Sequence, residues 1–142
     1  MLQKYKVTQN PKHINMQLSA EIIQANWEIF LTNIEEHISD KKDRKQKLLN
    51  FYKRYEERII LMPAAHKKEY HGAFPGGYVA HVNRVVEGSI RLYDMWEEMG
   101  CDMTTFTKEE LVFSAINHDL GKMGDKEHES YIPQMDKWRK DK

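Results

Sequence analysis

A histidine and an aspartate stand side by side in the stretch Ile116-Asn117-His118-Asp119-Leu120-Gly121-Lys122. Both are strong metal ligands, and they close an apolar run that reads as a helix. Gly121 allows a sharp turn behind the pair, and Lys122 adds a cation suited to a phosphate oxygen. The alternative is an ordinary helix end, where His118 and Asp119 hydrogen-bond to each other and Gly121 is the stop residue.

A second stretch of the same character lies about 40 residues upstream and reads Tyr70-His71-Gly72-Ala73-Phe74-Pro75-Gly76-Gly77-Tyr78-Val79-Ala80-His81. His81 falls one turn into a predicted helix, where it is either a ligand or a satisfied core histidine. His71 lies in the glycine-rich loop and is a candidate ligand, proton donor or phosphate contact. Gly76 and Gly77 allow close backbone approach ahead of a helix N-terminus, which favours anions; otherwise they form a plain turn.

The chain has 142 residues, enough for one domain with a real core. Lys+Arg and Asp+Glu number 22 each, so the overall charge does not indicate a nucleic-acid binder, although a local basic patch remains compatible with it. The single cysteine, Cys101, is expected to be a packed thiol in a reducing compartment. We see no signal peptide and no membrane span, and expect a cytoplasmic protein without a membrane partner. Both a monomer and an oligomer are compatible with the sequence.

Hydrophobic periodicity predicts an all-α fold with no strand. Residues 1–18 are expected to form an extended arm, residues 19–62 a helical pair, and residues 63–142 the core that carries the site. The third helix is expected to start near Gly77, bury a stripe that runs from Val79 to Trp96, and stop at Gly100. The fourth is capped by Thr107, ends near Gly121, and is expected to be the most buried. The second helix is predicted from Ser39 or Asp40 to Met62, before Pro63.

The first turns of that second helix concentrate positive charge in Lys41, Lys42, Arg44, Lys45 and Lys47. Such a run is typical of a solvated helix face, and a face directed at phosphates is the alternative.

Three segments together resemble the HD superfamily of metal-dependent phosphohydrolases. They are Pro63-Ala64-Ala65, the loop and helix start from His71 to His81, and the stretch from His118 to Lys122. The resemblance covers roughly residues 59 to 124. It is strongest to a branch with a His-rich Pro-Gly-Gly loop, which includes HD-domain 3′–5′ exoribonucleases, relaxase-associated HD domains and phage-encoded HD proteins. It implies an HD-domain-like helical bundle and a nucleotide or nucleic-acid phosphoester as substrate.

The resemblance also implies roles for individual residues. It assigns one or two divalent ions (Mn, Mg, Fe, Ni or Zn) to His81, His118 and Asp119, which are therefore expected to converge. The ion would activate a water for attack on the phosphoester. Asp119 and His71 are the expected catalytic residues. The residues expected to bind the substrate phosphate are Lys122, Arg84, Gly76 and Gly77.

The chain departs from the family after the His-Asp pair, where the family carries a further Asp on a later helix. Here Asp125, Asp136 and Asp141 lie in polar surroundings, and His128 is the substitute ligand to consider. We therefore expect an HD-like bundle without its last helices, either a fragment or a shortened variant. The alternative function is a catalytically inactive HD-like module that binds a nucleotide or a protein partner.

Overall fold

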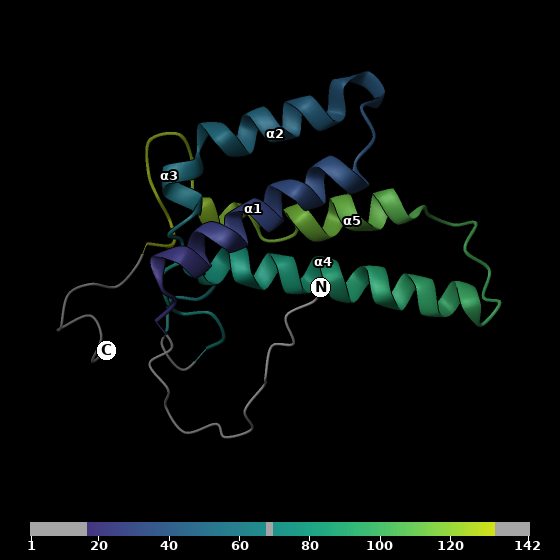
Figure 1. Cartoon of the computed structure of the whole chain (residues 1–142). Coiled ribbons are helices and arrows are strands. Elements are labelled where there is room, and N and C mark those ends of the chain that lie inside the picture. Colours follow the sequence, from purple (N-terminus) through teal and green to yellow (C-terminus); the bar gives the residue numbers. More distant parts are fainter. Residues whose placement is uncertain (1–16, 68–69, 133–142) are drawn as a thin grey trace.

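The computed structural model describes residues 17–67 and 70–132, and the prediction of an all-α fold is confirmed. The described residues form helices and loops without a strand, apart from one isolated bridge between Gly124 and Glu129. The elements, shown in Figure 1, are α1 (Ala20–His37), η1 (Lys41–Asp43), α2 (Arg44–Arg54), α3 (Glu56–Ile59), α4 (Gly77–Glu98), α5 (Lys108–Asn117) and η2 (Leu120–Met123). The arm expected over residues 1–18 lies almost wholly outside the described residues.

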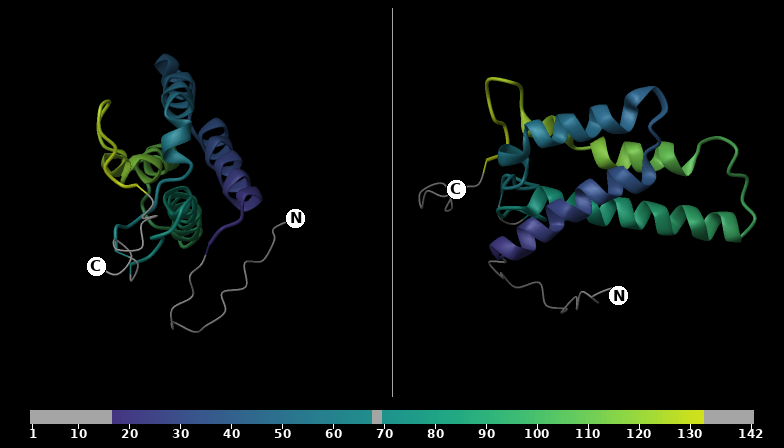
Figure 2. Two further views of the ribbon diagram at one scale, coloured as in Figure 1. Left: turned by 90° about the vertical axis from the view of Figure 1, so that its left-hand side faces the viewer. Right: turned by 45° about the horizontal axis from the view of Figure 1, so that its top comes forward.

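The long helix α4 forms one side of the bundle, and both α1 and α5 pack along it. In both views of Figure 2, α1 and α5 lie between α2 and α4. Aromatic side chains hold α1 and α2 together: the rings of Phe30 and Tyr52 meet edge to face with centroids 4.7 Å apart, and Trp27 stacks on Phe30 at 5.4 Å. All three are buried, as is Ile34, which lies one turn after Phe30 on α1.

The single helix predicted from Ser39 or Asp40 to Met62 is wrong, because the structure divides it into η1, α2 and α3. Tyr55 leaves helical geometry (φ −108°, ψ 18°), and its N–H donates to the carbonyl of Tyr52, a tightened turn that ends α2. Ile59 and Met62 beyond the break are nevertheless buried, as the periodicity predicted.

The start of α4 at Gly77 and its stop at Gly100 are confirmed, the latter with φ +79° and its N–H donated to the carbonyl of Glu97. Two expectations about this end are wrong: Trp96 is 49% exposed and Cys101 is exposed. The reason is length, since α4 has 22 residues and its partner α5 has 10, so the last turns of α4 run past α5 (Figure 1). No described helix combines the length and apolarity needed to cross a bilayer.

The capping box at the start of α5 is confirmed: the Thr107 hydroxyl accepts the Glu110 N–H at 3.2 Å, and the Glu110 carboxylate accepts the Thr107 N–H at 2.8 Å. The helix ends at Asn117, earlier than the predicted Gly121, and a 3₁₀ turn follows. Val112, Ala115 and Ile116 of its ten residues are buried, the largest buried fraction among the described α-helices, as expected.

The loop between α3 and α4 folds tightly onto the start of α4. The Ala64 N–H donates to the Gly72 carbonyl at 2.8 Å, and the Tyr78 N–H donates to the Met62 carbonyl at 3.0 Å. A Cβ atom on Gly77 would lie 2.0 Å from the carbonyl oxygen of Gly72. Gly77 is therefore required by packing, because any side chain would push the loop away from α4.

We expect Gly77→Ala to lower the free energy of unfolding by about 1–3 kcal/mol, because backbone would have to move. Gly88→Ala is the matched control on the same helix, since nothing lies within 4 Å of the added Cβ. The control should raise stability by about 1 kcal/mol through helix propensity. Urea denaturation measures both, and equal effects of the two substitutions would contradict the packing argument.

Thr107→Ala should cost about 1 kcal/mol of stability near neutral pH, the usual value of an N-cap. Hydrogen bonds from the Thr107 backbone and side chain hold the pKa of Glu110 below its ordinary value of 4.5. The ionised Glu110 therefore adds to the free energy of unfolding above pH 4.5. This contribution is lost as pH falls through the lowered pKa of the folded state. The stability difference between wild type and variant should shrink on that descent, as urea titrations at several pH values will show; a constant difference would argue against the reciprocal bonds.

Candidate metal centre

Three ligand atoms from two separate helices converge at one end of the bundle, as predicted. The Nε2 atoms of His81 and His118 are 3.2 Å apart, and the Asp119 Oδ2 lies 3.5 Å from the first and 3.3 Å from the second. Among the described residues, these three form the group whose geometry suits a metal ion. The side chains of His81 and Asp119 are mostly covered, and that of His118 is about one-third exposed.

Local backbone geometry explains how two consecutive residues reach the same point. His118 still has helical angles (φ −58°, ψ −32°), whereas Asp119 has left the helix (φ −109°, ψ 11°). Continued helix would have turned their side chains about 100° apart. Because helical backbone angles stop after His118, the imidazole and the carboxylate converge on His81 of α4.

A backbone carbonyl fixes the protonation of His118. Its Nδ1 lies 2.7 Å from the carbonyl oxygen of Ala115, and a carbonyl can only accept, so Nδ1 carries the hydrogen. The Nε2 atom of the neutral ring is then a lone-pair donor directed at His81 and Asp119. This arrangement is the one commonly found for a metal-bound imidazole, whose other ring nitrogen is anchored by a carbonyl or carboxylate.

His81 is held in the neutral form that binds metals. Burial lowers the pKa of His81, and the neighbouring His71 and His118 lower it further, while Asp119 opposes this shift. The net direction is below the ordinary value of 6.5, so the ring is mostly uncharged at neutral pH.

The carboxylate of Asp119 also carries an ion pair with Lys122, whose Nζ is 2.6 Å from Oδ2 and 2.9 Å from the Ala64 carbonyl oxygen. Partial burial raises the pKa of Asp119, but the hydrogen bond and charge of Lys122, with the two imidazoles, outweigh burial and leave it lower than usual. The ring of Tyr131 lies 5.6 Å from the same ammonium group. Lys122, which the sequence assigned to phosphate binding, is thus already paired with Asp119, an expected metal ligand.

Three polar residues behind the cluster were not assigned to the site from the sequence. The Tyr52 hydroxyl lies 3.0 Å from Oδ1 of Asn117, whose side-chain nitrogen donates to the Phe113 carbonyl. The Tyr78 hydroxyl is buried without a hydrogen-bond partner among the described residues; burial and the charge of Asp119 raise the pKa of this phenol. The sequence does not indicate the contact between Tyr52 and Asn117, because the two residues are 65 positions apart.

The other residues predicted for the site are His71, Arg84, Gly76 and Gly77. His71 is exposed, with its ring centroid 4.9 Å from that of His81. Arg84 is exposed on α4, three residues after His81. The structure does not support phosphate binding by Gly76 and Gly77, because their N–H groups donate to the carbonyls of Leu61 and Phe74.

The substitute ligands considered at the C-terminal side do not join the cluster. Asp125 accepts the backbone N–H groups of Glu127 and His128 and also pairs with the His128 ring at 3.4 Å, in an exposed loop. Asp136 and Asp141 lie outside the described residues. Within the described part of the chain, the candidate centre therefore contains a single carboxylate.

The donor set fits a divalent ion. Atoms bound to one ion at about 2.1 Å lie roughly 3.0–3.4 Å from one another, close to the three separations observed. Two neutral imidazoles and one carboxylate suit Mn, Fe, Ni or Zn, and Mg less well because it prefers oxygen ligands. Without a cation, the converging lone pairs of Nε2, Nε2 and Oδ2 would repel unless a proton lies between them.

Comparisons of this chain with protein-family models, with curated proteins and with solved structures found no match. The functional argument therefore rests on the chemistry of the cluster.

We expect the neutral His118 ring to be protonated on Nδ1, because the Ala115 carbonyl accepts that hydrogen. Nitrogen-15 NMR of the imidazoles near pH 8, with a chelator present, distinguishes the two tautomers by the chemical shifts of Nδ1 and Nε2. His37, whose ring forms no hydrogen bond with the described residues, serves as the internal reference for a ring without this constraint. A His118 ring protonated mainly on Nε2 would contradict the assigned orientation.

Proposed function

We propose that this chain is a metal-dependent phosphohydrolase of the HD type that acts on a nucleotide or nucleic-acid phosphoester. The observation that carries the proposal is the triangle of His81 Nε2, His118 Nε2 and Asp119 Oδ2, with sides of 3.2–3.5 Å. These three residues would hold the ion. A divalent cation there would supply charge neutralisation to a phosphate group and would increase the acidity of a coordinated water.

The surrounding residues suit a negatively charged substrate. Lys122 can exchange its ion pair with Asp119 for one with a phosphate oxygen, because its flexible side chain already lies at the cluster. The guanidinium of Arg84, exposed on α4, can reach a phosphate at the open side. His71, exposed beside His81, can give a proton to a leaving group or accept one from water.

A second candidate, a catalytically inactive HD-like module that binds a nucleotide or a protein partner, is favoured by one observation. The Lys122 ammonium lies 2.6 Å from Oδ2 of Asp119, the oxygen that completes the triangle. In this arrangement the lysine supplies the positive charge that an ion would otherwise bring. The two candidates differ in whether a metal ion displaces that ammonium.

Calorimetric titration with Mn²⁺ at neutral pH tests the assigned ligands. We expect wild type to bind weakly, since one carboxylate offsets only one of the two charges of the ion and Lys122 competes for the same oxygen. Asp119→Ala should abolish binding. Asp125→Ala is the matched control, because it removes an exposed carboxylate outside the cluster. Equal binding by wild type and Asp119→Ala would refute the site.

Hydrolysis of a generic phosphodiester such as bis(p-nitrophenyl) phosphate, in excess Mn²⁺, then separates the two functions. The phosphohydrolase should show activity that Asp119→Ala removes and Asp125→Ala keeps. Neither metal binding nor hydrolysis, with binding of a nucleotide or a protein partner retained, would favour the inactive module.

A further inference from the structure

Positive charge is concentrated in one segment of a chain whose charges otherwise balance. Residues 41–58, which form η1, α2 and α3, contain eight Lys or Arg and three Asp or Glu, whereas the whole chain has 22 of each. The rest of the molecule is therefore net acidic. Such an asymmetry is the electrostatic footprint expected of a surface that meets a polyanion.

This segment borders an open groove of about 390 Å³ between η1, α2 and α5. Its rim carries four cations and its lining includes two aromatic rings and one leucine; the lining residues are Lys41, Lys42, Arg44, Lys47, Leu48, Phe51 and Phe113. Phe51 and Phe113 are partly buried, and the Arg44 guanidinium lies 5.6 Å from the Phe113 ring centroid. The groove thus combines positive charge with flat apolar surface.

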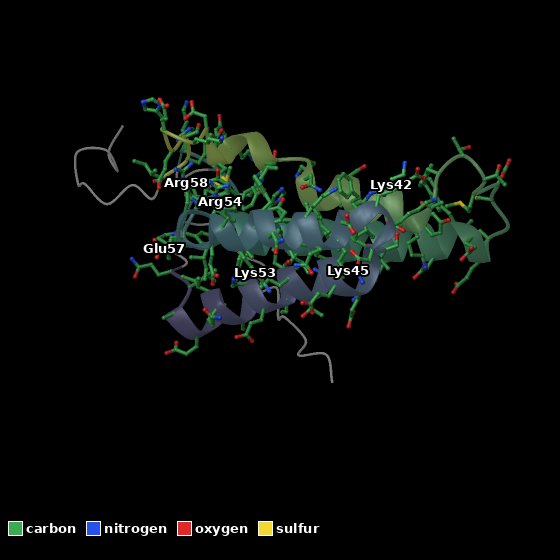
Figure 3. The ribbon with its side chains drawn as sticks, turned by 90° about the horizontal axis from the view of Figure 1, so that it is seen from above. Lys42, Lys45, Lys53, Arg54, Glu57 and Arg58 are labelled. Carbon is green, nitrogen blue, oxygen red and sulfur yellow. The ribbon has the colours of Figure 1, made fainter. Side chains whose placement is uncertain are left out.

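Several of these cations are not neutralised by the protein. Arg44 pairs with Glu109, Lys47 with Asp43 and Arg58 with Glu129. The other five cations of residues 41–58 form no ion pair with the described residues; they are Lys41, Lys42, Lys45, Lys53 and Arg54. Figure 3 views the molecule from the α2 side and shows the labelled basic side chains along the whole length of this face, from Lys42 at one end to Arg54 and Arg58 at the other.

The positions of the cations are not explained by helix stability. Lysine and arginine stabilise the last turn of a helix and are unfavourable in the first turn. The first turn of α2 nevertheless carries Arg44, Lys45 and Lys47 and no acidic residue. The preceding Lys42 and Asp43 both have positive φ (56° and 57°), a conformation that costs energy for residues other than glycine. Despite both energetic costs, Lys42, Arg44 and Lys47 line the groove.

From this we infer that the η1–α2 face binds single-stranded nucleic acid, with phosphates along the cations and bases against the groove. The 11 residues of α2 extend about 16 Å, which matches about five phosphates of a stacked strand. Positive grooves with aromatic platforms are the usual means of binding single strands without sequence preference. The inference does not rest on the proposed phosphohydrolase function, because none of these residues belongs to the metal centre.

The aromatic rings favour a nucleic acid over other polyanions. An acidic peptide would use the cations but has no need of the Phe51 and Phe113 surface, and an anionic membrane would favour apolar side chains that project beyond the lysines. A duplex keeps its bases stacked inside and would leave the rings uncovered. These alternatives are arms of the test below.

Fluorescence anisotropy of a labelled 12-nucleotide single strand, with chelator present, measures binding by the full chain. We expect Lys41→Gln/Lys42→Gln to weaken binding about tenfold at low salt and to reduce the slope of log affinity against log salt by about 1.4. Lys67→Gln/Arg91→Gln is the matched control, since it removes two positive charges outside the groove and should change affinity by about twofold or less. Circular dichroism verifies that each variant is folded.

Equal loss of affinity in the two double variants would overturn the inference, as would binding that does not depend on salt. Tighter binding of a duplex of the same sequence, of a polyglutamate peptide or of phosphatidylserine vesicles would also overturn it. Asp125→Ala, which changes an exposed carboxylate outside both the metal centre and the groove, should bind the strand like wild type under these conditions. If the metal titration fails while the strand still binds through Lys41 and Lys42, only the proposed enzymatic function is refuted.

Discussion

A single oxygen atom, Oδ2 of Asp119, connects the parts of this molecule that are far apart in sequence. It lies within 3.5 Å of nitrogen atoms on His81 of α4, on His118 at the end of α5 and on Lys122 of η2. Lys122 in turn reaches the Ala64 carbonyl in the loop before α4. A partly buried carboxylate needs compensating charge, so the same requirement that draws these segments together also creates an environment for a cation.

The helix ends that depend on local chemistry could be predicted from the sequence. Thr107 acts as an N-cap and Gly100 as the stop, because each makes its bonds within a few residues. The failures depend on tertiary packing. The break at Tyr55 interrupts a continuous apolar stripe, and Trp96 is exposed because α5 is too short to cover it. Periodicity identifies an apolar face, but not how far its partner extends.

The candidate site shows the same division. Motifs at the ends of two helices were enough to predict that His81, His118 and Asp119 converge. The ion pair of Lys122 and the contact between Tyr52 and Asn117 were not predicted, since nothing in the spacing of these residues says which of several partners each will choose. Gly76 and Gly77 had two plausible roles, and only the positions of the Leu61 and Phe74 carbonyls decide for packing.

The close contact between the loop and the start of α4 has a consequence for motion. Three backbone hydrogen bonds hold the two ends of the loop to each other and to the helix. They run from the N–H groups of Ala64, Gly76 and Tyr78 to the carbonyls of Gly72, Leu61 and Met62, respectively. Opening one bond requires the backbones of Gly72 and Gly77 to separate, which breaks the others. Hydrogen exchange at these amides should therefore proceed as one cooperative unit with the first turn of α4, and the loop that carries His71 moves with the helix that carries His81.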